Sequence, residues 1–334
     1  MSGDFVWRDA GRTVAFRRKG VAQAPQLLRE HGFEPFDLLA TSRSLATAAE
    51  LRGEATAVHE VAPGAVPDLA ADLLDRVSQR PLAAFGGGRT IDVAKAVAAV
   101  TGVPVAAIPT TMSGAEMTGI HRLPACAKVG VGSLVRPILV VADPEAMTSQ
   151  PEAALRASSM NALAHGLDSL YTPLANPVSE MTALRGAELI ATSLDEERQQ
   201  RNSGQLALGS LLCGYAIDSA LFGVHHVVCQ SLVRICGSPH AETNAAILPR
   251  TAALLVGRAP DRLARLAAAI STDPEDIEAR ILELGGNPAG LGAAGADRAK
   301  LDEALDAILV RPELAFTPDP PDRRELAELI EAAW

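Results

Sequence analysis

Residues 85–95 read FGGGRTIDVAK, where a short apolar run gives way to a helical pattern. The run at 81–85 has the length of a buried strand, and the helical pattern continues to about residue 101. Three successive glycines allow a ligand to approach the backbone closely, and the start of a helix offers N–H groups and a positive dipole to a phosphate. The stretch therefore indicates either a phosphate-binding turn or a tight turn that binds nothing. It lacks the GxGxxG spacing of an ordinary dinucleotide fingerprint.

Outward from this turn, the first 150 residues alternate short apolar runs with helical patterns. The predicted strands are 13–16, 36–41, 56–59, 81–85 and 103–108, and the predicted helices lie near 20–31, 43–51, 67–79 and 90–101. This alternation is typical of a doubly wound parallel sheet. A second turn, PTTMSGAEMT at 109–118, follows the last of these strands, and its hydroxyl groups can bind a phosphate or ribose or cap the local backbone. Both turns are expected at the carboxyl edge of one sheet.

The pattern changes at Pro151, because strand-like runs stop and Ala/Leu-rich helical periodicity takes over. Helices are predicted near 151–170, 177–199, 204–221, 241–257, 260–270, 274–285, 297–309 and 321–333. The sequence therefore predicts an α/β dinucleotide-binding domain with a parallel sheet over residues 1–150. An all-helical domain that carries the substrate or metal site is predicted over 151–334.

Composition narrows the function classes. The 334 residues are 48% apolar but only 3% aromatic, and 40 acidic against 30 basic residues give a net charge of −10. An acidic chain without a basic patch argues against nucleic-acid binding, and charges interrupt every apolar stretch before it reaches membrane-spanning length. With no apolar leader at the N-terminus and no CxxC pair among four cysteines, we expect a cytoplasmic protein with buried, reduced thiols.

Four of the seven histidines fall in the helical half, at His165, His225, His226 and His240. His165 lies four residues after Asn161 and so shares a helix face with it. Imidazoles at such places can converge on a cation, or each can be a hydrogen-bonded interior histidine. The second interpretation is preferred for the other three, His31, His59 and His121.

Several motifs, in this order, resemble the iron-containing alcohol dehydrogenase superfamily: GGGRTIDVAKA, PTTMSGAEMT, SSMNALAHGLDSLY, GVHHVVCQSL and SPHAETNAAILP. With the ending ELIEAAW, they are most similar to those of maleylacetate reductases, and the resemblance covers about residues 13–334. It implies a dehydroquinate synthase-like fold, NADH or NADPH as cofactor, and a homodimer.

Carried over to this sequence, the resemblance places the cofactor pyrophosphate on Gly86, Gly87 and Gly88. The ribose and nicotinamide side is implied for Thr110, Thr111 and Ser113, with Lys128 nearby. Arg89 and Asp92 belong to the first turn, and Arg89 replaces a serine common there. Ser42, next to Arg43, stands where NAD-preferring members often have Asp, so NADPH is compatible with the sequence.

Metal-dependent members of the superfamily bind iron or zinc through one Asp and three His. The matching positions here are Asn161, His165, His226 and His240, so a neutral amide replaces the carboxylate, as is typical of maleylacetate reductases. We therefore expect no metal; if one binds, its ligands would be the three histidines. Asp168, one turn beyond His165, is interpreted as an outer ligand or, preferably, as part of a solvated helix face.

The implied function is NAD(P)H-dependent reduction of the activated C=C bond of maleylacetate, or a related enoyl keto acid, to 3-oxoadipate. The residues implied for hydrogen-bond donation and proton transfer are Asn161, His165, His225, His226 and His240. Arg122 and Lys128 are candidates for binding the carboxylates of this small dicarboxylate, together with His226 and His240. The alternatives are a metal-dependent alcohol or aldehyde dehydrogenase, a dehydroquinate synthase-like cyclase or lyase, and a non-catalytic binding protein.

Overall fold

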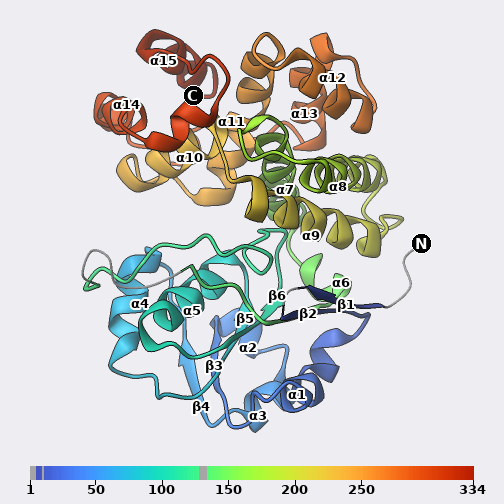
Figure 1. Ribbon diagram of the computed structural model, residues 1–334, viewed down its shortest axis with the longest axis vertical. Helices are drawn as coiled ribbons and strands as arrows, with labels where there is room; N and C mark the ends of the chain where they lie inside the picture. Colours follow the sequence, from blue (N-terminus) through green and yellow to red (C-terminus); the bar gives the residue numbers. More distant parts are fainter. Residues whose placement is uncertain (1–4, 10, 128–133) are drawn as a thin grey trace. The chain divides into compact units, whose positions relative to one another are not determined.

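The computed structural model describes residues 5–9, 11–127 and 134–334. Two compact units divide the chain, Met1–Gln150 and Pro151–Trp334 (Figure 1). The first contains the sheet and the second is helical, which confirms the predicted fold class.

In the described part of the N-terminal unit, one seven-stranded sheet has the order β1-β2-β7-β6-β5-β3-β4. The strands are β1 (Phe5–Asp9), β2 (Arg12–Phe16), β3 (Asp37–Ala40), β4 (Ala57–Glu60), β5 (Leu82–Gly86), β6 (Val105–Pro109) and β7 (Leu139–Ala142). All neighbours pair in parallel except β1 and β2, which are antiparallel. Every predicted strand is present to within two residues at each end, whereas β1 and β7 were not predicted.

Helices cover both faces of this sheet, because successive strand residues point to opposite sides. Leu38, Phe85 and Ile108 pack on one side with α1 (Gly20–Glu30) and α3 (Ala49–Glu54). Leu39 and Ala107 pack on the other side, with the helices that Figure 1 labels α4 and α5. Those helices are α4 (Val66–Leu74) and α5 (Gly88–Thr101), and the two short ones of this unit are α2 (Ser42–Leu45) and α6 (Pro144–Met147). The helix predicted near 43–51 is therefore two helices, α2 and α3.

The strand order reverses direction between β3 and β5. From β3 the chain continues outward to β4, whereas from β5 it continues through β6 to β7 on the other side. Ligands of open α/β sheets bind outside the carboxyl ends of strands at such a reversal. The residues that follow β3 and β5 there are Ser42 and the three glycines Gly86–Gly88.

The C-terminal unit packs its helices around α7 (Glu152–Tyr171), which is buried along most of its length. The others are α8 (Pro177–Asp195), α9 (Ser203–Ala220), α10 (Val224–Ile235), α11 (His240–Val256), α12 (Pro260–Ala269), α13 (Ile277–Leu284), α14 (Leu301–Leu309) and α15 (Arg323–Ala332), with short 3₁₀ turns at Pro274–Asp276, Arg298–Lys300 and Pro312–Phe316. Glycines let α8 and α9 approach closely, since a Cβ on Gly209 would lie 2.8 Å from the Gly186 carbonyl oxygen. Helix α10 was not predicted.

No single helix of the described chain is long and apolar enough to cross a bilayer. Only α9 and α10 taken together reach the required length and hydropathy, and they meet at a bend of 98°. All four cysteines are free; Cys213, Cys229 and Cys236 are buried as expected, but Cys126 is exposed, so the expectation of four buried thiols was wrong for that residue.

Candidate active site

The two turns of the N-terminal unit lie side by side. Gly86 at the end of β5 is paired with Pro109 at the end of β6, and the Thr110 N–H donates to the Gly86 carbonyl oxygen at 3.0 Å. The predicted neighbourhood of residues 86–88 and 110–113 is thus formed at the carboxyl edge of the sheet.

Close packing explains the three glycines, since Gly86 lies against Thr90 of α5 and Gly87 and Gly88 lie against the second turn. An added Cβ would lie 2.6 Å from Thr90 Oγ1 at Gly86, 2.8 Å from Thr111 Cγ2 at Gly87 and 2.9 Å from Ser113 Cβ at Gly88. Such contacts are closer than carbon atoms tolerate. The second turn therefore rests directly on the first only because side chains are missing there.

Polar groups at the same place suit a phosphate. Helix α5 starts at Gly88, so its first backbone N–H groups point out of this turn. Within the described part of the chain, the buried hydroxyl oxygens of Thr90 and Thr111 have no hydrogen-bond partner. A ligand with phosphate oxygens would satisfy such donors, so these residues fit the pyrophosphate of a dinucleotide.

Two buried cations donate hydrogen bonds to the last residues of the second turn and to the segment that follows it. Lys95 is fully buried on α5, and its Nζ donates to Asp92 Oδ1 at 2.8 Å and to the carbonyl oxygens of Ala115 (3.0 Å) and Ile120 (2.7 Å). Arg12 of β2 donates to the Met117 carbonyl oxygen at 2.7 Å. Asp92, a predicted cofactor residue, is therefore part of this internal network.

Glu116 lies between Ala115 and Met117 in the sequence, the residues whose carbonyl oxygens these cations bind, and it is fully buried. Among the described residues, neither of its carboxylate oxygens has a hydrogen-bond partner. Burial raises the pKa of Glu116 from 4.5 to about 7, although the positive charges of Lys95 and Arg12 act in the opposite direction. The sequence analysis assigned no role to Glu116 or Lys95.

Other predicted residues of this unit lie on its surface. Ser42, which follows β3, and Arg89, which follows β5, are exposed after the two strands between which the strand order reverses. Arg122, the candidate for carboxylate binding, is also exposed. Arg43 donates to the Ser149 carbonyl oxygen at 3.1 Å. Lys128 lies outside the described residues.

The C-terminal unit brings the predicted histidines together. Helix α7 carries Asn161 and His165, α10 carries His225 and His226 in its first turn, and α11 begins at His240. The rings of His165 and His226 are stacked with centroids 4.9 Å apart and planes 20° apart, and the His225 ring meets His226 edge-on at 4.9 Å. His240 is exposed, whereas the other three histidines are buried.

Asp168 holds His226 from α7. Its Oδ2 lies 2.7 Å from His226 Nδ1 and accepts the backbone N–H groups of Gly223 and His226, each at 3.2 Å. Its Oδ1 accepts a short hydrogen bond from the Tyr171 hydroxyl. Asp168 is fully buried, so its assignment to a solvated helix face was wrong.

His225 uses both of its ring nitrogens inside the unit. Nδ1 lies 3.0 Å from Thr251 Oγ1, and Nε2 lies 2.9 Å from Asn244 Oδ1. His226 and His165 differ from it, because the part of the chain described here offers no hydrogen-bond partner to His226 Nε2 or His165 Nδ1. The buried group thus keeps one nitrogen on each of these two rings for a ligand.

Burial fixes the charge of these rings. It lowers the pKa of His225 and of His226 from 6.5 to about 3, and it lowers the pKa of His165 well below 6.5. The neighbouring imidazoles lower these pKa values further, because each would repel a second positive charge. All three rings are therefore neutral at physiological pH.

The histidine group does not present a ready set of transition-metal ligands. Among the described residues, no three His, Cys, Asp or Glu side chains are arranged to hold an ion. Asn161 also offers an amide where a carboxylate would supply negative charge.

Gln230 connects α10 to a later part of the chain. It lies one turn after His226 on α10 and accepts from Arg311 Nη2 at 3.1 Å. Arg311 is also paired with Glu313 through Nε at 2.9 Å and lies 6.0 Å from the Phe222 ring, which in turn contacts His226. Gln230 thus links α10 to the segment that precedes Pro312.

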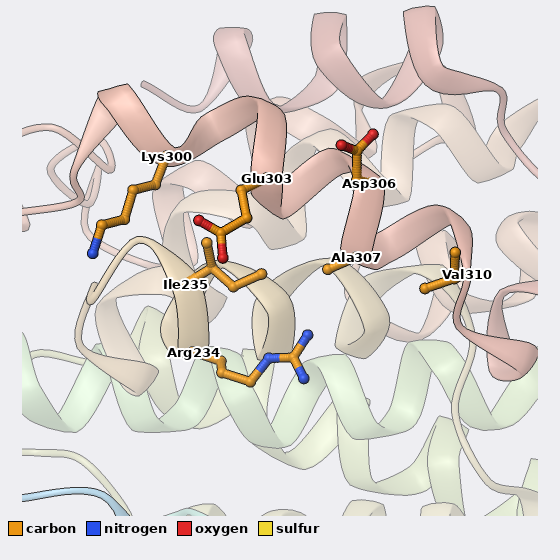
Figure 2. A pocket seen from close by; sticks show the side chains of 7 residues that line it. All are labelled: Arg234, Ile235, Lys300, Glu303, Asp306, Ala307 and Val310. Carbon is orange, nitrogen blue, oxygen red and sulfur yellow. The ribbon is translucent and has the colours of Figure 1, made fainter.

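A separate pocket of about 680 Å³ opens to solvent between the end of α10 and α14 (Figure 2). Its walls are formed by Arg234, Ile235, Lys300, Glu303, Asp306, Ala307 and Val310. These charges have both signs, and none of the predicted site residues contributes to it. It is therefore not the candidate active site.

Two family profiles match the chain. One described as "Fe-containing alcohol dehydrogenase family, C-terminal" matches residues 156–334, and one described as "Iron-containing alcohol dehydrogenase" matches residues 16–151. The chain belongs to the iron-containing alcohol dehydrogenase family.

Relatives within this family carry a common name. "Maleylacetate reductase 1" of Rhodococcus opacus is 32% identical over 291 residues, which are 85% of this chain and 80% of the relative. "Maleylacetate reductase" of Rhizobium sp. (strain MTP-10005) is 29% identical over 99% of this chain and 97% of the relative. The crystal structure of maleylacetate reductase from Agrobacterium tumefaciens has a TM-score of 0.84 at 26% identity, covering 100% of this chain and 99% of that one.

The family motifs contain both the histidines and the residues that hold them, because Asp168 and Tyr171 stand in SSMNALAHGLDSLY and Asn244 stands in SPHAETNAAILP. The motifs do not show which residues pair. Asp168 is 58 residues from His226, and Asn244 is 19 residues from His225, so no local pattern links either pair. The one local signal is spacing, since Asp168 lies three residues after His165 and Tyr171 three residues after Asp168 on α7.

Proposed function

We propose that this protein is an NAD(P)H-dependent reductase that converts maleylacetate, or a closely related enoyl keto acid, to 3-oxoadipate or the matching saturated keto acid. The observation that carries the proposal is the buried group of neutral imidazoles with a nitrogen of His165 and of His226 left for a ligand. The relatives of this chain that are named maleylacetate reductases support the choice of substrate.

The N-terminal unit is assigned to the cofactor. Gly86, Gly87 and Gly88 admit the pyrophosphate to the start of α5, and the hydroxyls of Thr90 and Thr111 donate to it. Bound NAD(P)H supplies a hydride to the alkene carbon farther from the keto group. The electron pair of the C=C bond then becomes an enolate, which needs one proton at the carbon next to the keto group.

The C-terminal unit is assigned to the substrate and the proton. His240 is exposed and exchanges protons with solvent, whereas His226 and His165 are buried and offer Nε2 and Nδ1. The negative charge of a bound dicarboxylate favours a protonated imidazole, which can then donate to the enolate. His225 has both nitrogens occupied, so we assign it a supporting role.

No step of this reaction is assigned to a metal. The amide of Asn161, which supplies no negative charge to a metal, favours a reaction that relies on the histidines alone. The competing activity is that of a metal-dependent alcohol or aldehyde dehydrogenase, which would require added iron or zinc.

The test is oxidation of NADH and of NADPH with freshly generated maleylacetate, with a chelator or with added iron or zinc. We expect turnover that survives the chelator. Turnover of aldehydes only after metal addition would replace the proposal with the competing activity. If neither NADH nor NADPH is oxidised with maleylacetate under any of these conditions, this substrate is rejected.

Cofactor preference is tested at the end of β3. Ser42 and Arg43 are exposed there and suit the 2′-phosphate of NADPH. Ser42→Asp is expected to raise KM for NADPH about 10-fold with little effect on NADH, because a carboxylate repels the phosphate and accepts from a ribose hydroxyl. Equal KM changes for both cofactors would contradict this assignment.

A further inference from the structure

Asp168 Oδ2 lies at the start of α10 and is surrounded by donors. Two are the backbone N–H groups of Gly223 and His226, each at 3.2 Å, and the third contact is His226 Nδ1 at 2.7 Å. Two accepted N–H groups, together with the Tyr171 hydroxyl on Oδ1, favour the ionised carboxylate, which only accepts. The hydrogen of the third contact is therefore assigned to His226 Nδ1.

The neighbouring ring is held in the opposite way. Asn244 Nδ2 donates to the His240 carbonyl oxygen at 2.7 Å, which turns Asn244 Oδ1 toward His225 Nε2 at 2.9 Å. A carbonyl oxygen only accepts, so His225 carries its hydrogen on Nε2. Thr251 Oγ1, 3.0 Å from His225 Nδ1, is then placed to donate to that nitrogen in place of the Leu248 or Ile247 carbonyl oxygen, which it reaches at 3.0 and 3.2 Å.

We propose that Asp168 is a positioning residue that fixes His226 as the Nδ1–H tautomer and aims its Nε2 lone pair at the substrate, beside a His225 fixed as the Nε2–H tautomer. Two consecutive histidines thus have opposite tautomers, and only His226 presents an unbonded nitrogen. The catalytic meaning of this arrangement rests on the proposed reductase function, but the tautomers themselves do not.

The position of Asp168 explains why it acts through His226 and not on the substrate. Its side chain is fully buried, and its two oxygens are occupied by Tyr171, Gly223 and His226. A hydrogen bond from an orienting carboxylate sets both the tautomer and the ring angle of a histidine. Without this hydrogen bond the His226 ring could rotate or exchange tautomers. Its Nε2 would then no longer face a proton acceptor or donor in a fixed direction.

The direct test is ¹⁵N NMR of the full-length protein labelled at histidine, with His226 assigned by comparison with His226→Ala. We expect one ring with protonated Nδ1 and unprotonated Nε2 for His226 in the wild type at neutral pH. In Asp168→Asn that pattern should be lost. Tyr171→Phe is the matched control, because it removes a donor to Oδ1 and leaves all three contacts of Oδ2; it should keep the pattern.

Kinetics of NAD(P)H oxidation with maleylacetate test the positioning role. Asp168→Asn is expected to lower kcat about 100-fold with a smaller change in KM, and to have no further effect on kcat in a His226→Ala background. A His226 protonated at Nε2 in the wild type overturns the proposal even if Asp168→Asn does not fold. So does an equal loss of kcat with and without His226. A wild type with the expected tautomer but no turnover rejects the reductase function alone.

Discussion

His225 and His226 are adjacent in the sequence but have different surroundings. His225 is bonded to Thr251 and Asn244, whereas His226 keeps Nε2 without a partner in the described chain. We expect His226→Ala to lower kcat about 100-fold and also to cost about 1–3 kcal/mol of unfolding free energy, because buried Asp168 loses a donor. His225→Ala should cost a similar unfolding free energy, because buried Asn244 and Thr251 lose a partner, but it removes no nitrogen left for a ligand and should lower kcat far less.

Parallel kinetics and urea unfolding of the two variants check this contrast. His31→Ala, on the partly exposed end of α1, is the control for both measurements. If His226→Ala left turnover intact, the placement of the site on α10 would be wrong.

Glu116 makes a pH-dependent contribution of its own. Its pKa is raised from 4.5 to about 7, so the folded protein holds a proton there that the unfolded chain releases between these pH values. The stability that Glu116 contributes is therefore present below pH 4.5 and lost as the pH rises through 7. Glu116→Gln is expected to be more stable than the wild type by roughly 3 kcal/mol at pH 8 and by less than about 1 kcal/mol at pH 5.

Urea unfolding at both pH values measures this difference. Glu60→Gln, on exposed β4, provides the same chemical change without burial and should show no such trend. A constant difference between Glu116→Gln and wild type at the two pH values would contradict the buried, protonated carboxyl.

At the scale of elements, the two turns proposed to bind the cofactor form one surface only while the glycines keep them in contact. Gly87→Ala would bring a Cβ to 2.8 Å from Thr111 Cγ2 and push the second turn away. We expect Kd for NADPH to rise at least about 10-fold, since misplaced donors lose charge-assisted hydrogen bonds. Fluorescence titration with NADPH measures it.

Gly53→Ala in α3 is the matched control for that experiment. It makes the same change in the same unit, and among the described residues nothing lies within 4 Å of the added Cβ. Equal affinity of Gly87→Ala and Gly53→Ala would reject the turn as the cofactor site.

The elements that sequence patterns predicted are those with a clear period. Buried strands β2 to β6 are short apolar runs, and α7, α8 and α9 are long Ala/Leu segments. Helix α10 was missed because HHVVCQ is rich in β-branched and ring side chains, which have low helix propensity, and packing overrides that preference. β7 was also missed, although its four apolar residues LVVA are as long a run as the predicted strands β3 and β4.

The candidate site could be predicted only in part. Family motifs marked Gly86–Gly88, His165, His226 and His240, whose residue types suit the chemistry proposed for them. The supporting residues Asp168, Asn244 and Arg311 are selected by contacts that exist only after folding, up to 81 residues away in sequence. Those contacts leave no local pattern.

At the scale of the whole molecule, buried neutral histidines make stability depend on pH. His165, His225 and His226 have pKa values below 6.5 in the folded state, so the unfolded chain binds more protons as the pH falls below 6.5. Stability is therefore constant above that pH with respect to these groups and falls toward acid. Each histidine contributes up to about 1.4 kcal/mol per pH unit.

Trp334 offers a reporter for this unit, because Trp7→Phe leaves it as the sole tryptophan of the sequence. We expect the urea midpoint from its fluorescence to fall between pH 7 and pH 5, and to fall less steeply when His225→Gln is added. An unchanged midpoint over this range would show that the three rings are not held neutral by the fold.

Lys95 and Arg12 also bear on how a dinucleotide binds. They hold the carbonyl oxygens of Ala115, Ile120 and Met117 from inside the unit, so the segment after the second turn is tied to helix and strand without any ligand. The conformational entropy of ordering that segment is lost when the chain folds, not when the cofactor arrives. A binding site that is already ordered loses none of the free energy of its ligand contacts to ordering a loop. The rate at which it binds a dinucleotide is then set by diffusion and charge instead of by a loop that must close.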